Sequence, residues 1–287
     1  MTDDAQSFLA LPVHHVQVDG GALAYRELGE GPPLLLVHGW PLWGFTWRHM
    51  LPVLAAQHRC VVVDLLGAGE SRWDRETDVG LAAQARALAR LLTKLEIEGA
   101  AVVAHDTGAT IARQLALIAP ARVGALVLID TEIPNHRPPL VQAFQLLAAL
   151  PGAARLFGRG LRSPALVRSS LGFGGCFDDR DLVQGDFGEH IVSRLANDRR
   201  ALEGQMAYAR AIDWDLIDSL AEGHRRIHQK TLLLWGERDP FFPIDRAREM
   251  VEQFPNCEGL EAFPGRLFIQ EERALRVAQR TLRFLKA

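Results

Sequence analysis

Short apolar runs alternate along this chain with longer segments whose apolar residues recur at three- and four-residue spacing. The apolar runs are residues 34–38, 60–64, 100–104, 125–130 and 231–236. Because these runs have no polar face, they predict strands of a parallel sheet that helices cover on both sides. The segments 79–97 and 109–119 have the periodicity of amphipathic helices. The alternation predicts an α/β fold with a mostly parallel, doubly wound sheet.

The alternation stops after Asp130 and resumes at Thr231. The residues between them are rich in helix formers and are interrupted by several prolines. Ligands of open α/β sheets bind at the carboxyl edge of the strands, so we expect an inserted helical cap over that edge. The predicted division is a core domain (residues 1–131 and 229–287) and a helical cap domain (residues 132–228). The alternative is a second packing layer without a role in binding.

The composition excludes several classes of protein. The 287 residues carry a net charge of −3 and dispersed Lys and Arg residues, so we expect no nucleic-acid partner. No stretch approaches the roughly 20 apolar residues of a membrane span, and the first residues lack the features of a secretory signal. Three widely spaced cysteines indicate reduced thiols. We therefore expect a cytoplasmic monomer or homodimer with no membrane partner.

The segment "VVAHDTGATIARQLA" places Asp106 at the tip of a strand, turn and helix. Gly108 and Ala109 are small enough to let the helix pass close to the strand. This is the layout of a nucleophile elbow, in which the side chain is exposed near helix N–H groups that favour an anion. Ala104 stands where such elbows often have glycine. The alternative interpretation of Asp106 is an ordinary helix N-cap.

Two further segments contain groups that can assist a nucleophile. In "LLLVHGWP", the backbone N–H of Trp40 can form an oxyanion hole with that of Thr107; one such donor contributes about 2.7–4 kcal/mol. The alternative for Trp40 is a packed residue in a tight turn. In "LLLWGERDPFFP", Asp239 follows a late strand, where an acid can orient a histidine. By itself, Asp239-Pro240 is also an ordinary turn.

Taken in order, these motifs resemble those of the α/β-hydrolase family over nearly all of residues 13–287. The resemblance is strongest to the branch of epoxide hydrolases and haloalkane dehalogenases, whose nucleophile is Asp. It is carried by "HGWP", "DLLGAGESRW", "HDTG", "WGERDP" and "FIQEE". The resemblance implies that Asp106 attacks an electrophilic carbon and forms an alkyl-enzyme ester, with Asp239 as the acid of the triad.

The family's catalytic histidine falls on Leu267, just before "IQEE". With an unperturbed pKa of about 3.9, Asp106 would be ionised at neutral pH and able to attack without a base. Hydrolysis of the ester is different, because water must lose a proton, and a positioned base contributes about 10²–10⁴-fold. Leucine accepts no proton. A histidine of the inserted region or its return could reach the site instead: His136, His190, His224 or His228.

Three explanations for Leu267 stay open at this point. The chain is an engineered or trapped form of a hydrolase, or it is a natural isomerase, cyclase or lyase that uses Asp106 as an acid or base. The third explanation is a non-catalytic relative that binds a small hydrophobic molecule.

The resemblance also bears on the substrate. Dehalogenases of this branch often have Trp directly after the nucleophile, where this chain has Thr107. Its epoxide hydrolases use cap tyrosines as donors to the epoxide oxygen, and Tyr208 is the candidate here. We therefore favour an epoxide-like substrate over a haloalkane, with Tyr208 and Trp40 in contact with it.

No metal or organic cofactor is expected. No Cys, His and carboxylate cluster has ligand spacing in the sequence, and "GEGPP" lacks the glycine pattern of a phosphate-binding loop.

Overall fold

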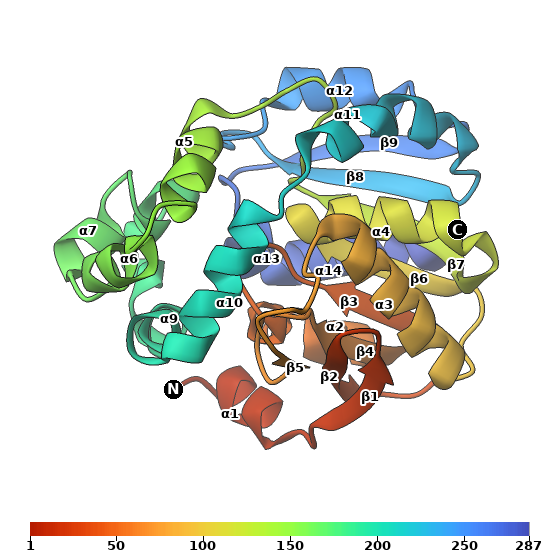
Figure 1. Cartoon of the computed structure of the whole chain (residues 1–287). Helices are drawn as coiled ribbons and strands as arrows, with labels where there is room; N and C mark the ends of the chain where they lie inside the picture. Colours follow the sequence, from red (N-terminus) through yellow and green to blue (C-terminus); the bar gives the residue numbers. More distant parts are fainter. Residues whose placement is uncertain (287) are drawn as a thin grey trace.

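The computed structural model describes residues 1–286, in which strands form one mixed sheet (Figure 1). The strand order is β1-β2-β4-β3-β6-β7-β8-β9, and β5 pairs with β2. The strands are β1 (His14–Val18), β2 (Gly21–Leu28), β3 (Pro33–Val37), β4 (Arg59–Asp64), β5 (Arg72–Trp73), β6 (Ala100–His105), β7 (Val123–Ile129), β8 (Lys230–Gly236) and β9 (Cys257–Phe263).

The sheet is parallel from β4 to β9, and β1, β2 and β5 are antiparallel. The predicted strands correspond to β3, β4, β6, β7 and β8 within two residues at each end. Their residues are almost all buried, which explains why they have no polar face. The carboxyl ends of β6, β7 and β8 lie next to one another, so the residues that follow these strands meet at one edge of the sheet.

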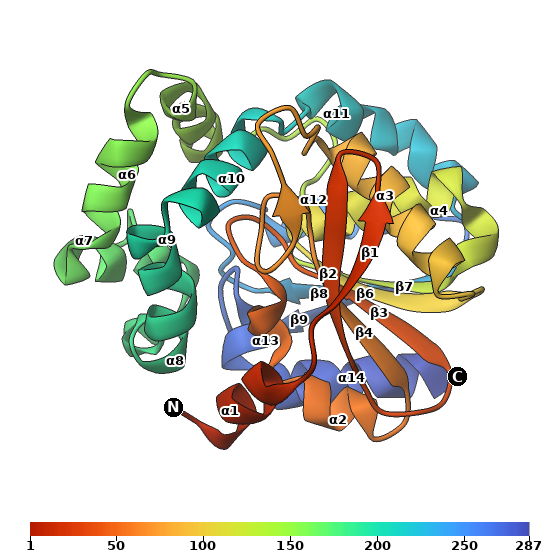
Figure 2. The same cartoon turned by 60° about the horizontal axis from the view of Figure 1, so that its bottom comes forward.

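Helices cover both faces of the sheet (Figure 2). The predicted periodic segments form α3 (Leu81–Lys94) and α4 (Thr107–Ile118) on one face. The other face carries α2 (Leu51–Ala55) and α14 (Ala274–Lys286), which contact each other. The short helices α1 (Asp3–Ala10) and α13 (Ile269–Glu272) lie beside that layer, and α12 (Ile244–Val251) packs on β8 and β9.

The segment between β7 and β8 is helical, and most of it projects beyond one edge of the sheet (Figure 1). The projecting helices are α5 (Pro139–Ala148), α6 (Ala153–Leu161), α7 (Pro164–Arg168), α8 (Gly185–Phe187), α9 (Ser193–Asn197) and α10 (Arg199–Arg210). In contrast, α11 (Trp214–Gly223) packs on α4 of the core layer. The projecting part is therefore shorter than residues 132–228, whose assignment as a separate domain stays a prediction.

No helix within residues 1–286 combines the length and the apolar composition that a bilayer crossing requires.

Candidate active site

Asp106 lies in the turn between β6 and α4 with a strained backbone, at φ 53° and ψ −134°. Its backbone N–H donates to the carbonyl oxygens of Ile129 and Asp130, both at 3.0 Å. Its carbonyl oxygen accepts hydrogen bonds from the Thr131 hydroxyl at 2.9 Å and from the Ala109 N–H at 2.8 Å. A positive φ at a non-glycine residue persists only where the surroundings hold it. The end of β7 therefore fixes the elbow that the sequence predicted.

Two backbone N–H groups point at the Asp106 carboxyl group. The Trp40 N–H donates to Asp106 Oδ2 at 2.8 Å, the Thr107 hydroxyl donates to the same atom at 3.3 Å, and the Thr107 N–H is close enough to lower the pKa of this carboxyl group. Gly39 makes this approach possible, because a Cβ there would lie 2.5 Å from Asp106 Oδ2. The structure thus brings together the two amides expected to form an oxyanion hole, and in this state they hold the carboxylate.

The Asp106 carboxyl group faces a cavity of about 560 Å³ between the core and the projecting helices. Aromatic and aliphatic side chains form most of its wall, including Trp40, Phe144 and Trp214. The charged residues that line it are Asp106, Glu132 and Arg159. A cavity of this size with few polar groups suits a small apolar ligand.

Burial raises the pKa of the Asp106 carboxyl group well above its usual value, and the charge of Glu132 raises it further. The hydrogen bonds from Thr107 and Trp40 act in the opposite direction. Glu132 itself accepts hydroxyl hydrogen bonds from Thr110 at 2.6 Å and Thr131 at 3.0 Å. The expectation that Asp106 has an ordinary pKa is therefore wrong, because the sequence does not reveal its desolvation or its acidic neighbour.

Leu267 lines the cavity and is 5% exposed, and no histidine between residues 1 and 286 is among the lining residues. His105 lies behind it, where its ring Nε2 contacts the Leu267 carbonyl oxygen at 3.0 Å. Burial lowers the pKa of His105 to about 3, so this ring is neutral.

The histidines of the inserted region or its return do not line the cavity either. His136 Nε2 lies 2.8 Å from the Phe241 carbonyl oxygen, and His228 is exposed on the surface. His224 is buried between Arg113 and Gln253. His190 contacts Phe45 and Glu189, beside α8.

Asp239 is paired with a second carboxyl group, that of Asp130. Asp239 Oδ1 accepts the N–H groups of Phe241 and Phe242, and Asp130 Oδ1 accepts the Gly236 N–H at 2.7 Å. Both Oδ2 atoms are buried and accept no hydrogen bond, and each carboxyl group affects the pKa of the other. Two buried carboxyl groups that interact this closely are not both ionised, so we infer that they share a proton. Burial raises the pKa of Asp239 to about 7 and that of Asp130 well above its usual value.

The tyrosine and tryptophan donors near the cavity are engaged within the protein. The Tyr208 hydroxyl donates to Thr107 Oγ1 at 2.9 Å, and Tyr208 is fully buried and absent from the cavity wall. The indole N–H of Trp40 donates to the Gln205 carbonyl oxygen, and that of Trp214 donates to Gln145 Oε1. Tyr208 therefore reaches the cavity only through the Thr107 hydroxyl, which does line it.

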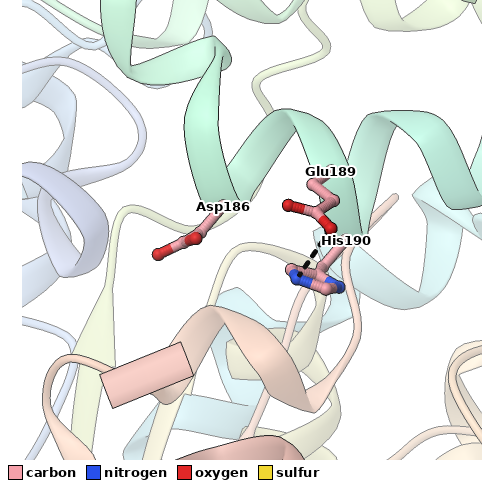
Figure 3. A group of neighbouring side chains, drawn as sticks. All are labelled: Asp186, Glu189 and His190. Atoms are coloured by element: carbon pink, nitrogen blue, oxygen red, sulfur yellow. Dashed lines mark ion pairs between the residues drawn. The ribbon is translucent and has the colours of Figure 1, made fainter. Parts of the chain in front are cut away.

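A second group of polar side chains lies apart from this cavity, around α8 (Figure 3). Asp186, Glu189 and His190 place their potential metal ligands within 4.8 Å of one another, which the sequence spacing did not suggest. However, the Asp186 carboxylate already accepts hydrogen bonds from the backbone and hydroxyl of Thr2. Its main role in this structure is to anchor the segment before α1.

Comparison with known proteins identifies the family. The family model described as alpha/beta hydrolase fold matches residues 32–274, which confirms the predicted fold class. A haloalkane dehalogenase from Mesorhizobium japonicum is 27% identical over 88% of this chain and 84% of that protein. Bifunctional epoxide hydrolase 2 from Sus scrofa is 33% identical over 46% of this chain and 24% of that protein. The solved structure of epoxide hydrolase CorEH superposes with a TM-score of 0.78 at 20% identity, over 96% of this chain and 99% of that one.

The shared proton predicts a pH dependence of stability. The pKa of Asp239 is about 7 in the folded protein, against about 3.9 for an unperturbed Asp. Between these values the folded state binds more protons than the unfolded state, so stability falls as pH rises through this window. Asp130→Asn keeps an acceptor for Gly236 and donates an N–H to Asp239. We expect this variant to lose less stability between pH 4.5 and pH 7.5, measured by urea unfolding.

The control is Asp245→Asn, whose carboxylate is 86% exposed in a surface ion pair with Arg248. The stability of this control variant should depend on pH as that of the wild type does. The same loss in Asp130→Asn as in the wild type would show that the two carboxyl groups do not share a proton.

Proposed function

Because the chain belongs to the α/β-hydrolase family, we propose that it is an enzyme that acts on a small hydrophobic electrophile through Asp106. The observation that carries this proposal is the Asp106 carboxyl group, held by the Trp40 and Thr107 N–H groups at the wall of an apolar cavity. Such a carboxylate is positioned to attack a carbon atom and form an ester.

An epoxide is the substrate class that the site supports best. Attack by Asp106 forms a C–O ester bond and breaks a C–O bond of the strained ring, and the ring oxygen then takes a proton. The Thr107 hydroxyl lines the cavity and can give its proton to the ring oxygen while it takes one from the Tyr208 hydroxyl, which is left as a phenolate. A halide would instead need N–H donors, and the indoles of Trp40 and Trp214 are engaged elsewhere.

The same site favours formation of the ester over its hydrolysis. Leu267 lines the cavity at the position to which the resemblance assigns the family's histidine, and we infer that Asp239 shares its proton with Asp130. A water molecule in the cavity therefore has no imidazole to take its proton. We infer that the alkyl-enzyme is long-lived.

A second function is favoured by the raised pKa of Asp106. A protonated carboxyl group in an apolar cavity can donate a proton to a substrate and take it back at another atom. This corresponds to an isomerase, cyclase or lyase, for which Leu267 is no defect because no ester is hydrolysed.

Covalent capture distinguishes these possibilities. Incubation with small epoxides and haloalkanes should add one substrate mass, which peptide mapping by mass spectrometry places on Asp106. Asp106→Asn should abolish the adduct. Cys176→Ser, which removes a thiol from the same cavity wall, should keep it.

Each other outcome has a distinct meaning. Product without an adduct and without incorporation of ¹⁸O from water would favour the non-hydrolytic enzyme. Saturable binding that survives Asp106→Asn, with neither product nor adduct, would favour a non-catalytic relative. An adduct on Cys176 would contradict the role of Asp106.

Restoring the base should restore hydrolysis. In Leu267→His, we expect the adduct to disappear faster by about 10²–10⁴-fold, the usual contribution of a positioned base. The measurement is the decay of the alkyl-enzyme mass, with ¹⁸O from water entering the product. Leu267→Gln is the matched control, because it adds polarity without a base. Equal decay in both variants would show that the missing imidazole is not what limits hydrolysis.

The pH dependence of Asp106 alkylation tests how the charge of Glu132 affects Asp106. Asp106 attacks only when ionised, and its raised pKa places the rise in rate at a higher pH than for an ordinary Asp. Glu132→Gln removes the second carboxylate but can still accept the Thr110 hydroxyl. We expect its rate profile for adduct formation to shift to lower pH. An unchanged profile would mean that Glu132 carries no charge at this site.

A further inference from the structure

We call the outer surface of α5, α6, α7 and the following Leu171 the α5–α7 face. It combines exposed leucines with arginines. Seven leucines on it are between 40% and 75% exposed: Leu140, Leu146, Leu147, Leu150, Leu156, Leu166 and Leu171. Water-exposed apolar patches of this kind usually mark a surface that contacts a partner. Figures 1 and 2 both show these helices at the end of the molecule that projects from the sheet.

The charged residues that this segment itself contributes to the α5–α7 face have one sign. Residues 133–177 contain five arginines and no Asp or Glu, although the whole chain has a net charge of −3. Arg137 and Arg168 pair with acids from outside this segment. The exposed cations without an acidic partner are Arg155, Arg159 and Arg162, on or next to α6; of these, Arg162 donates to the Ala196 carbonyl oxygen.

The α5–α7 face also surrounds the mouth of the cavity. Five of its exposed leucines line the cavity as well: Leu140, Leu147, Leu156, Leu166 and Leu171. Arg159 lies at the same rim, three residues after Leu156 on α6. A molecule that covers this face would therefore meet the entrance to Asp106.

We propose that the α5–α7 face docks on the surface of an anionic lipid bilayer, so that apolar substrates pass from the lipid into the cavity. Leucines inserted at the boundary between headgroups and acyl chains, with arginines at the level of the phosphates, are the usual composition of an interfacial helix surface. A second copy of the chain is a poorer occupant. In a twofold interface the face would meet itself, and its unpaired arginines would face one another.

This docking departs from the expectation of no membrane partner, which rested on the lack of a spanning segment. A peripheral surface needs no such segment. The passage of substrates from the lipid rests on the proposed function of Asp106, whereas the docking itself can be measured without any reaction.

The test is sedimentation of the full chain with vesicles of phosphatidylcholine, with and without 30% phosphatidylglycerol. We expect at least tenfold more bound protein with the anionic vesicles, and a loss of binding as salt is raised. Arg155→Gln should weaken binding about fivefold, from roughly 1 kcal/mol for each basic residue near the surface. Arg283→Gln, an exposed arginine on α14, is the control and should bind like the wild type.

The leucines have a matched control elsewhere on the surface. Leu146 and Leu150 are 73% and 58% exposed and do not line the cavity, so Leu146→Ser with Leu150→Ser should abolish vesicle binding while covalent capture by Asp106 is kept. Ile118→Ser with Leu275→Ser removes side chains that are 50% and 56% exposed on other helices and should not affect binding.

Three outcomes would overturn the proposal. They are no binding to anionic vesicles, equal binding to both compositions, and equal loss in the Leu146/Leu150 and Ile118/Leu275 variants. Self-association that Leu146→Ser with Leu150→Ser abolishes, measured by analytical ultracentrifugation without lipid, would assign the face to a second copy instead.

Discussion

The properties of the cavity depend on the free-energy cost of burying the Asp106 carboxyl group. Asp106 is 7% exposed at a wall made mostly of apolar side chains. A carboxylate removed from water is costly unless hydrogen bonds replace its hydration, and here the N–H groups of Trp40 and Thr107 do so in part. The charge of Glu132 opposes them. The result is a carboxyl group whose proton is held more tightly than usual, which gives it access to both nucleophilic and proton-transfer chemistry.

The cost of burying a charged carboxylate also governs the pair of Asp130 and Asp239. In a site with an imidazole, an acid at the position of Asp239 stabilises the cation that forms. With Leu267 in the cavity there is no cation to stabilise, and two ionised carboxylates in contact would repel each other without compensation. A shared proton removes one of the two charges. The apolar residue at 267 and the acid at the end of β7 are therefore compatible with each other, whatever reaction the site performs.

Features that depend on residues adjacent in sequence could be predicted. Features that depend on contacts between distant segments could not. The buried strands were found because their apolar runs are continuous, and the Asp106 elbow because strand, turn and helix are adjacent in sequence. β9 was missed because its residues are mostly half-exposed and mixed in polarity. The Asp130 pair was missed because it needs β7 and β8 side by side, and the direction of Tyr208 because it depends on how α10 packs against the elbow.

The projecting helices therefore form two parts with different properties. On one side, α10 is tied to the core by hydrogen bonds from Trp40 to Gln205 and from Tyr208 to Thr107. On the other side, α5–α7 present leucines to the surroundings at the cavity mouth. Water that entered through this mouth would hydrate Asp106 and return its pKa toward the ordinary value. Lipid over the α5–α7 face would instead keep the cavity dry, so the proposed docking and the raised pKa of Asp106 reinforce each other.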